Sequence, residues 1–235
     1  MTHRATGSRA LTTGALARVE GEGAMKIEIR DGELVDVQLN IYEPPRFFEG
    51  FLRGRGFNEP ADITARICGI CPVAYQMSAC HALEDALGVT VDGPLRELRR
   101  LLYCGEWIES HTLHVHMLHA PDFLGVDSVI DMAAVDRGAV ERGLEIKKIG
   151  NEILEVVGGR AIHPVNVKVG GFYRTPAPSE LRPLRARLDR GLELATQVVD
   201  TVAGFEFPDQ DMDHELVAVD HPDEYPMLGE RLVSD

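Results

Sequence analysis

The chain has 235 residues, which is enough for one large domain or two small ones. Its formal net charge of −14 argues against nucleic acid as a partner, because a phosphate backbone requires a basic surface. No segment approaches the ~20 consecutive apolar residues that span a bilayer. The polar N-terminal residues also lack the hydrophobic core of a secretory signal, so the sequence predicts a cytoplasmic chain with no membrane span.

The first part of the chain predicts a small β structure. Residues 1–16 are polar and slightly basic, and we expect a loose N-terminus there. Over residues 17–41 apolar and polar residues alternate on both sides of Asp31-Gly32, which predicts a β-hairpin with its turn at that dipeptide. A short helix is expected between the prolines at 44–45 and Gly54.

The remainder of the chain is dominated by helical periodicity. Apolar residues recur at three- and four-residue spacing, which marks the buried stripe of a helix. The pattern predicts four long helices, at about 72–88, 92–119, 131–157 and 179–203. A short strand is expected within 162–173, and only residues 216–219 suggest a strand in the acidic, proline-broken segment after Phe205.

These elements predict a mainly α fold with a small β part, an α+β protein of long packed helices preceded by a hairpin. The expected divisions are a loose N-terminus at 1–16, one domain at 17–205, and the start of a truncated C-terminal region at 206–235.

Cys68 and Cys71 are the chemically most informative of the four cysteines. Two cysteines separated by two residues bring their sulfurs close enough to share a metal. Pro72 fits the first position of a helix, which places Cys71 at the N-cap, where the helix dipole favours a thiolate. The spacing alone leaves open metal ligation, a redox-active dithiol or an incidental pair. A structural zinc site would require about two further ligands.

Other metal-binding residue types have simpler interpretations. The four histidines of the second helix spread over more than half of its circumference at about 100° per residue, so they cannot all converge on one ion. We interpret them as surface and packing residues; they are His111, His114, His116 and His119. Cys80 lies on the apolar stripe of its helix and is expected to be a core residue, as is Cys104.

The segment containing the cysteine pair, ARICGICPVAYQMSACHALEDALGV, resembles the N-terminal metal-binding motif of nickel–iron hydrogenase large subunits, RxCGxCxxxH. Further segments resemble other blocks of that family in the same order. They are RVEG, EPPRFFEGFLRGR, CGEWIESHTLHVHMLHAPDFLG and GGRAIHPVNVKVGGFYR, and the last two are similar to the cytoplasmic, multi-subunit branch. The resemblance covers the chain from about residue 17 and implies the N-terminal half of a large subunit.

The resemblance implies a role for each matching residue. Cys68 would be a terminal nickel ligand, and Cys71 would bridge nickel and iron. Glu20 would be the carboxylate that relays protons next to the site. Glu49 would help to hold a magnesium ion away from the nickel, and Arg66 precedes Cys68 as the motif requires.

A complete enzyme of this family would oxidise H2 reversibly by heterolytic cleavage at a nickel–iron centre whose iron carries diatomic ligands. The implied partners are an iron–sulfur small subunit and diaphorase-type electron-transfer subunits. Because this chain lacks the cysteines for clusters of its own, the iron–sulfur clusters would belong to the partner subunit.

The sequence departs from the family pattern in two places. Tyr75 stands where the family more often has histidine, and it keeps an O–H donor but loses a ring nitrogen that titrates near neutrality. The second cysteine pair of the family, in a DPCxxCxxH motif, is absent, so nickel would have two thiolates in place of four. We therefore expect the chain alone to be inactive. The alternatives are a truncated or non-catalytic relative that acts as a scaffold or interaction subunit, and a structural zinc-binding protein.

Overall fold

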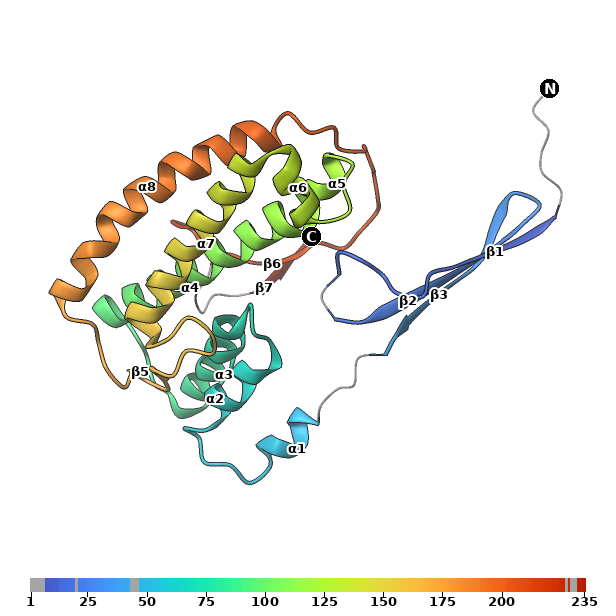
Figure 1. The fold of residues 1–235 in the computed structure, drawn as a ribbon. Coiled ribbons are helices and arrows are strands. Elements are labelled where there is room, and N and C mark those ends of the chain that lie inside the picture. Colours follow the sequence, from blue (N-terminus) through green and yellow to red (C-terminus); the bar gives the residue numbers. More distant parts are fainter. Residues whose placement is uncertain (1–6, 20, 43–46, 227, 229–231) are drawn as a thin grey trace. The chain divides into compact units, whose positions relative to one another are not determined.

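The computed structural model describes residues 7–19, 21–42, 47–226, 228 and 232–235. The chain forms two compact units, Met1–Phe47 and Phe48–Asp235. The first contains an antiparallel sheet and the second is largely helical, which confirms the predicted mainly α fold with a small β part (Figure 1). The predicted domain limits stay predictions. None of the described helices is both long enough and apolar enough to cross a bilayer.

The sheet of the first unit has the order β1-β2-β3. Strands β2 (Gly23–Arg30) and β3 (Glu33–Ile41) form the predicted hairpin. Asp31 and Gly32 have φ angles of 50° and 84°, the left-handed conformation that a tight hairpin turn requires.

Strand β1 (Ser8–Thr12) lies within the stretch that we expected to be loose. It pairs antiparallel with β2, from Ser8 opposite Arg30 to Thr12 opposite Lys26. All five of its residues are exposed, so backbone hydrogen bonds and not burial define this strand. Burial-based sequence patterns carry no signal for a strand of this kind.

The second unit begins with three short helical segments, α1 (Phe48–Leu52), α2 (Pro60–Thr64) and the 3₁₀ turn η1 (Ala65–Ile67). Helix α3 (Pro72–Leu87) follows after the cysteine pair. It ends at Gly88, whose φ of 65° gives the left-handed cap that glycine favours. These bounds confirm the first predicted long helix.

The next predicted helix continues in a different geometry near its end. Helix α4 (Gly93–Leu113) runs into a π-helical segment, η2 (His114–His119), and then into α5 (Ala120–Phe123). The i→i+5 hydrogen bonds of a π-helix change which side chains are neighbours in η2, and a pattern search at 3.6 residues per turn does not detect such a change.

The third predicted helix is in fact two helices, α6 (Val129–Val135) and α7 (Arg137–Gly158). The break lies at Asp136, whose carboxylate accepts a hydrogen bond from the Ala139 N–H at 2.9 Å. This N-cap starts a new helix, so the prediction of one continuous helix was wrong.

The C-terminal part contains the last long helix and two small sheets. Strands β4 (Val167–Lys168) and β5 (Gly171–Phe172) pair within the predicted 162–173 segment. Helix α8 (Pro178–Val202) matches the fourth predicted helix. Strand β6 (Val217–Val219) pairs with β7 (Leu232–Ser234).

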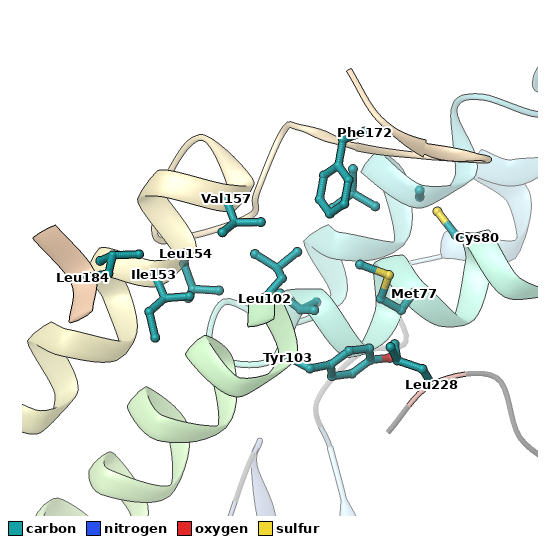
Figure 2. Packing of buried hydrophobic residues seen from close by; sticks show 13 residues of the cluster. Met77, Cys80, Leu102, Tyr103, Ile153, Leu154, Val157, Phe172, Leu184 and Leu228 are labelled. Atoms are coloured by element: carbon teal, nitrogen blue, oxygen red, sulfur yellow. The ribbon is translucent and has the colours of Figure 1, made fainter. Parts of the chain in front are cut away.

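The hydrophobic core of the second unit lies mainly among α3, α4 and α7 (Figure 2). Figure 2 shows the packed side chains, among them Met77, Cys80, Leu102, Tyr103, Ile153, Leu154, Val157, Phe172, Leu184 and Leu228. Helices α4 and α7 approach so closely that a Cβ at Gly150 would lie 2.6 Å from the carbonyl oxygen of Gly105. Glycine is therefore needed there for the two backbones to meet.

A buried ion pair ties α3 to α4 and to the β4–β5 turn. The Arg99 guanidinium donates to both carboxylate oxygens of Glu84, at 2.8 and 2.6 Å. Glu84 also accepts the backbone N–H of Gly170 at 2.7 Å, and Arg99 donates to the Lys168 carbonyl. Bidentate pairing satisfies most of the polar atoms that this burial removes from water.

Candidate metal centre

Cys68 and Cys71 face each other in the connection between η1 and α3. The structure pairs their sulfurs as a disulfide, with the two Cα atoms 5.5 Å apart. The Cys71 N–H also points to Cys68 Sγ at 3.1 Å. Both side chains are half-buried. The two sulfurs therefore converge on one point, which is the arrangement that two ligands of one metal centre require.

Cys71 occupies the N-cap of α3, and Pro72 takes the first helical position, as the sequence predicts. The Cys71 side chain makes no capping hydrogen bond to its own helix. Instead, the carboxylate of Glu106 on α4 accepts the N–H groups of Val73 at 2.6 Å and Ala74 at 3.2 Å. The first turn of α3 is thus capped from a different helix.

Glu106 is a buried carboxylate with 2 % exposure. Its burial raises the pKa to about 7, although the hydrogen bonds from Val73 and Ala74 act in the opposite direction. The negative charge of Glu109 raises it further. Glu106 thus exchanges its proton near neutrality.

The segment before the pair is helical, because α2 and η1 lead directly into it. A thioredoxin-like dithiol instead follows a β-strand in a βαβ unit. The local architecture therefore differs from that of a redox-active dithiol of the thioredoxin type.

The other predicted site residues lie in several places. Arg66 is exposed in η1 and pairs with Asp62 at 3.2 Å. Tyr75 lies on α3 with 36 % exposure, and Glu49 is exposed on α1. Glu20 lies outside the described residues. Of the predicted residues, the structure brings Cys68 and Cys71 into direct contact.

The histidine-rich segment differs from the α-helical expectation. In the π-helical geometry His114 and His119 become neighbours, with ring centroids 4.2 Å apart, although an α-helix would separate them. His116 is buried against Gly143, and its burial lowers its pKa. His116 therefore packs as predicted, whereas the predicted angular separation of His114 and His119 was wrong.

The two remaining cysteines are poor candidates for ligands. Cys80 is fully buried in the core, and burial raises the pKa of its thiol to about 11. Cys104 is half-buried, and burial raises its pKa as well. A metal ligand must be a thiolate, and both environments favour the neutral thiol.

The donor set fits part of a nickel–iron centre. Once their disulfide is reduced, the two converging sulfurs supply the soft thiolates that nickel and iron accept. Across the residues that the structure describes, no group of three or more His, Cys, Asp or Glu side chains is placed to hold a metal. A four-ligand zinc site is therefore not assembled within this part of the chain.

The sequence reasoning missed three buried carboxylates, those of Glu84, Glu106 and Glu109. Glu84 follows Cys80 by four residues, and Glu106 follows Leu102 by four. Each of these two acids thus occupies the buried stripe of its helix, which is a detectable signal because unpaired acids are rarely buried.

Comparison with known proteins agrees with the site. Residues 46–142 match the model of a family described as nickel-dependent hydrogenase. The alpha subunit of sulfhydrogenase 2 from Pyrococcus furiosus is 41 % identical over 189 residues, which cover 80 % of this chain and 46 % of that protein. The periplasmic [NiFeSe] hydrogenase large subunit of Desulfomicrobium baculatum is 30 % identical over 211 residues, covering 79 % and 40 %.

Solved structures give the same result. An NAD+-reducing [NiFe]-hydrogenase in the H2-reduced state matches with a TM-score of 0.77 and 32 % identity, covering 83 % of this chain and 45 % of that one. A Ni-Fe-Se hydrogenase from D. vulgaris Hildenborough matches with a TM-score of 0.71 and 28 % identity, covering 84 % and 45 %. The chain spans about half the length of the curated relatives it matches. Fold, motif and relatives together show that this chain belongs to the nickel–iron hydrogenase large-subunit family.

Proposed function

We propose that this chain supplies Cys68 and Cys71 as thiolate ligands to the nickel–iron centre of a hydrogenase that oxidises H2 reversibly. The observation that carries the proposal is the convergence of the two sulfurs at the start of α3, in a chain of this family. When bound, the nickel–iron centre supplies the heterolytic cleavage of H2. Cys68 is proposed as a terminal nickel ligand and Cys71 as the bridge between nickel and iron.

The position of Cys71 supports a thiolate role. An N-cap residue lies at the positive end of the helix dipole, which stabilises a negative charge. The Cys71 sulfur is directed towards Cys68 and does not cap the helix. After reduction of the disulfide, both features leave the Cys71 sulfur available to a metal.

The proton and cation roles are proposed for other residues. Glu20 is proposed to accept the proton that H2 cleavage releases, as a carboxylate can do in general acid–base chemistry. Arg66 keeps a positive charge two residues before Cys68, and Tyr75 offers a hydroxyl donor on α3. Glu49 is proposed to contribute a carboxylate oxygen to a magnesium ion.

Electrons are proposed to leave through iron–sulfur clusters of a partner small subunit, with diaphorase-type subunits as further acceptors. A cluster of this kind needs about four cysteine ligands. Beyond Cys68 and Cys71 the chain has Cys80 and Cys104, whose environments raise the thiol pKa. The other two thiolates of a four-thiolate centre are proposed to come from the part of a large subunit that this chain does not span.

The test is metal analysis of the chain purified together with its hydrogenase partners and the remaining part of the large subunit. We expect nickel and iron in equal amounts, and H2 uptake with an electron acceptor. Cys71→Ser should abolish both, because the bridging sulfur is lost, and Cys68→Ser should abolish nickel binding. Cys104→Ala is the matched control and should keep metals and activity. Binding of zinc alone, or full H2 uptake by Cys71→Ser, would contradict the proposal.

A further inference from the structure

Glu106 occupies a position that a simple structural cap does not require. Its two carboxylate oxygens reach Val73 and Ala74 across 33 and 32 residues of sequence. A helix is usually capped by its own N-cap side chain, through a short-range hydrogen bond. Here that position holds Cys71, whose sulfur is directed to Cys68.

Glu106 caps the first turn of α3, and Cys71 is left to face Cys68. A side chain that caps its own helix must turn towards the first helical N–H groups and cannot also face a metal. Glu106 takes over the capping from α4, which leaves the Cys71 sulfur directed towards its partner cysteine. The backbone of the first turn of α3 is therefore anchored without using a ligand.

The carboxylate of Glu106 is also held in a fixed orientation. Glu106 is 2 % exposed, and Val73 is fully buried. Both oxygens of the carboxylate are used, which fixes the orientation of the group as well as its position. Burying a carboxylate costs free energy, whereas an exposed Ser or Asn cap would satisfy the same N–H groups at a lower cost.

We propose that Glu106 is a positioning residue for the cysteine pair, since it holds the first turn of α3 so that the sulfurs of Cys68 and Cys71 converge. The proposal rests on the proposed function in so far as the converging sulfurs serve a metal. Its geometric part concerns only the described residues and can be measured without nickel or iron.

Three variants of the full chain separate geometry from charge. Glu106→Asp keeps the charge but withdraws the oxygens by about one bond length (~1.5 Å). Glu106→Gln loses the charge and keeps the original reach, but it has one acceptor oxygen in place of two, because an NH2 donor replaces the other oxygen. Glu109→Gln is the matched control, because Glu109 is an equally buried acid on the same helix that pairs with Lys147.

The first readout is the equilibrium between dithiol and disulfide at Cys68 and Cys71, in a buffer of reduced and oxidised dithiothreitol. Closure forms one S–S bond and passes two electrons and two protons to oxidised dithiothreitol. The second readout is Co²⁺ binding to the reduced chain, followed by the thiolate-to-cobalt absorption band. We expect Glu106→Asp to lower both equilibrium constants about tenfold, the size of one lost hydrogen bond to a charged group.

We expect Glu106→Gln, which loses one of the two acceptor oxygens, to lower both constants by about threefold, and Glu109→Gln to leave both constants unchanged. Wild-type behaviour of Glu106→Asp would overturn the inference. So would a loss in Glu106→Gln with retention in Glu106→Asp, because charge and not geometry would then be responsible. An equal loss in Glu109→Gln would overturn it as well. If the disulfide equilibrium follows the expected pattern but the wild-type chain takes up no nickel and iron together with its partners and the remaining part of the large subunit, the positioning role stands and the proposed function fails.

Discussion

The closest approach of α4 and α7 gives a quantitative stability prediction. A Cβ added by Gly150→Ala would lie 2.6 Å from the Glu109 nitrogen and 2.6 Å from the Gly105 oxygen. Both neighbours are helix backbone, so the two helices must separate to accept one methyl group. Overpacking of this kind costs about 1–3 kcal/mol, and rigid neighbours favour the upper end.

Part of this cost is offset. Alanine is a better helix former than glycine by about 1 kcal/mol. We therefore expect Gly150→Ala to lower the free energy of unfolding by about 2 kcal/mol, and the melting temperature by roughly 4–8 °C for a unit of this size. Urea unfolding followed by circular dichroism at 25 °C measures the first quantity, and a thermal scan the second.

Gly138→Ala is the matched control on the same helix. Gly138 is exposed, and its added Cβ would meet only Asp136 Oδ1, at 3.4 Å. This variant should equal the wild type or gain up to about 1 kcal/mol. The packing argument fails if Gly150→Ala is as stable as the wild type, or if the two variants lose the same amount.

Three further predictions concern buried charges and a cap. Arg99→Met leaves the Glu84 carboxylate buried without its guanidinium, so the free energy of unfolding should fall by about 3–5 kcal/mol; an unchanged urea midpoint contradicts this. Burial raises the pKa of Glu106 in the native state. As pH rises from ~4.5 to ~7, the unfolded state loses this proton while the native state still binds it, so the free energy of unfolding should fall. Glu106→Gln should remove that part of the pH dependence, and parallel urea midpoints for both proteins between pH 5 and 7.5 would refute it. Asp136→Ala removes the cap on the Ala139 N–H and should cost about 1 kcal/mol, together with faster amide exchange in the first turn of α7.

The Glu84 carboxylate makes the free energy of unfolding depend on pH in the direction opposite to that of Glu106. Burial alone would raise its pKa, but the hydrogen bonds from Arg99 and Gly170 outweigh burial and lower it. A depressed pKa contributes stability above the unfolded value of ~4.5, and that stability is lost as pH falls through the folded pKa. The difference in urea midpoint between the wild type and Glu84→Gln should therefore shrink under acid conditions. A constant difference down to pH 3 would contradict the assignment.

Much of the fold follows from local sequence signals. The hairpin turn at Asp31-Gly32 and the end of α3 at Gly88 were predictable, because each depends on residues that tolerate positive φ. The start of α3 at Pro72 follows in the same way from the missing N–H of proline. These features are encoded within a few residues of where they occur.

The remaining features depend on partners that are distant in sequence. Strand β1 exists because β2 pairs with it, and its own burial pattern carries no information. The capping of α3 by Glu106 requires α4 to fold back beside it, which a local pattern does not encode. The contact of His114 with His119 depends on a local π-helical register that 3.6-residue periodicity does not reveal.

The long-range hydrogen bonds of α3 also have a consequence for the order of events during synthesis. Gln76 donates to the Pro164 carbonyl and Glu84 accepts from Gly170, 88 and 86 residues further along the chain. At the usual ~5–20 residues per second, a ribosome needs roughly 4–17 s to add that length. During this interval the thiols of Cys68 and Cys71 are already synthesised while the helix beside them lacks its final supports. The cysteine pair is therefore made several seconds before the hydrogen bonds that fix α3 to residues 164–170 can form.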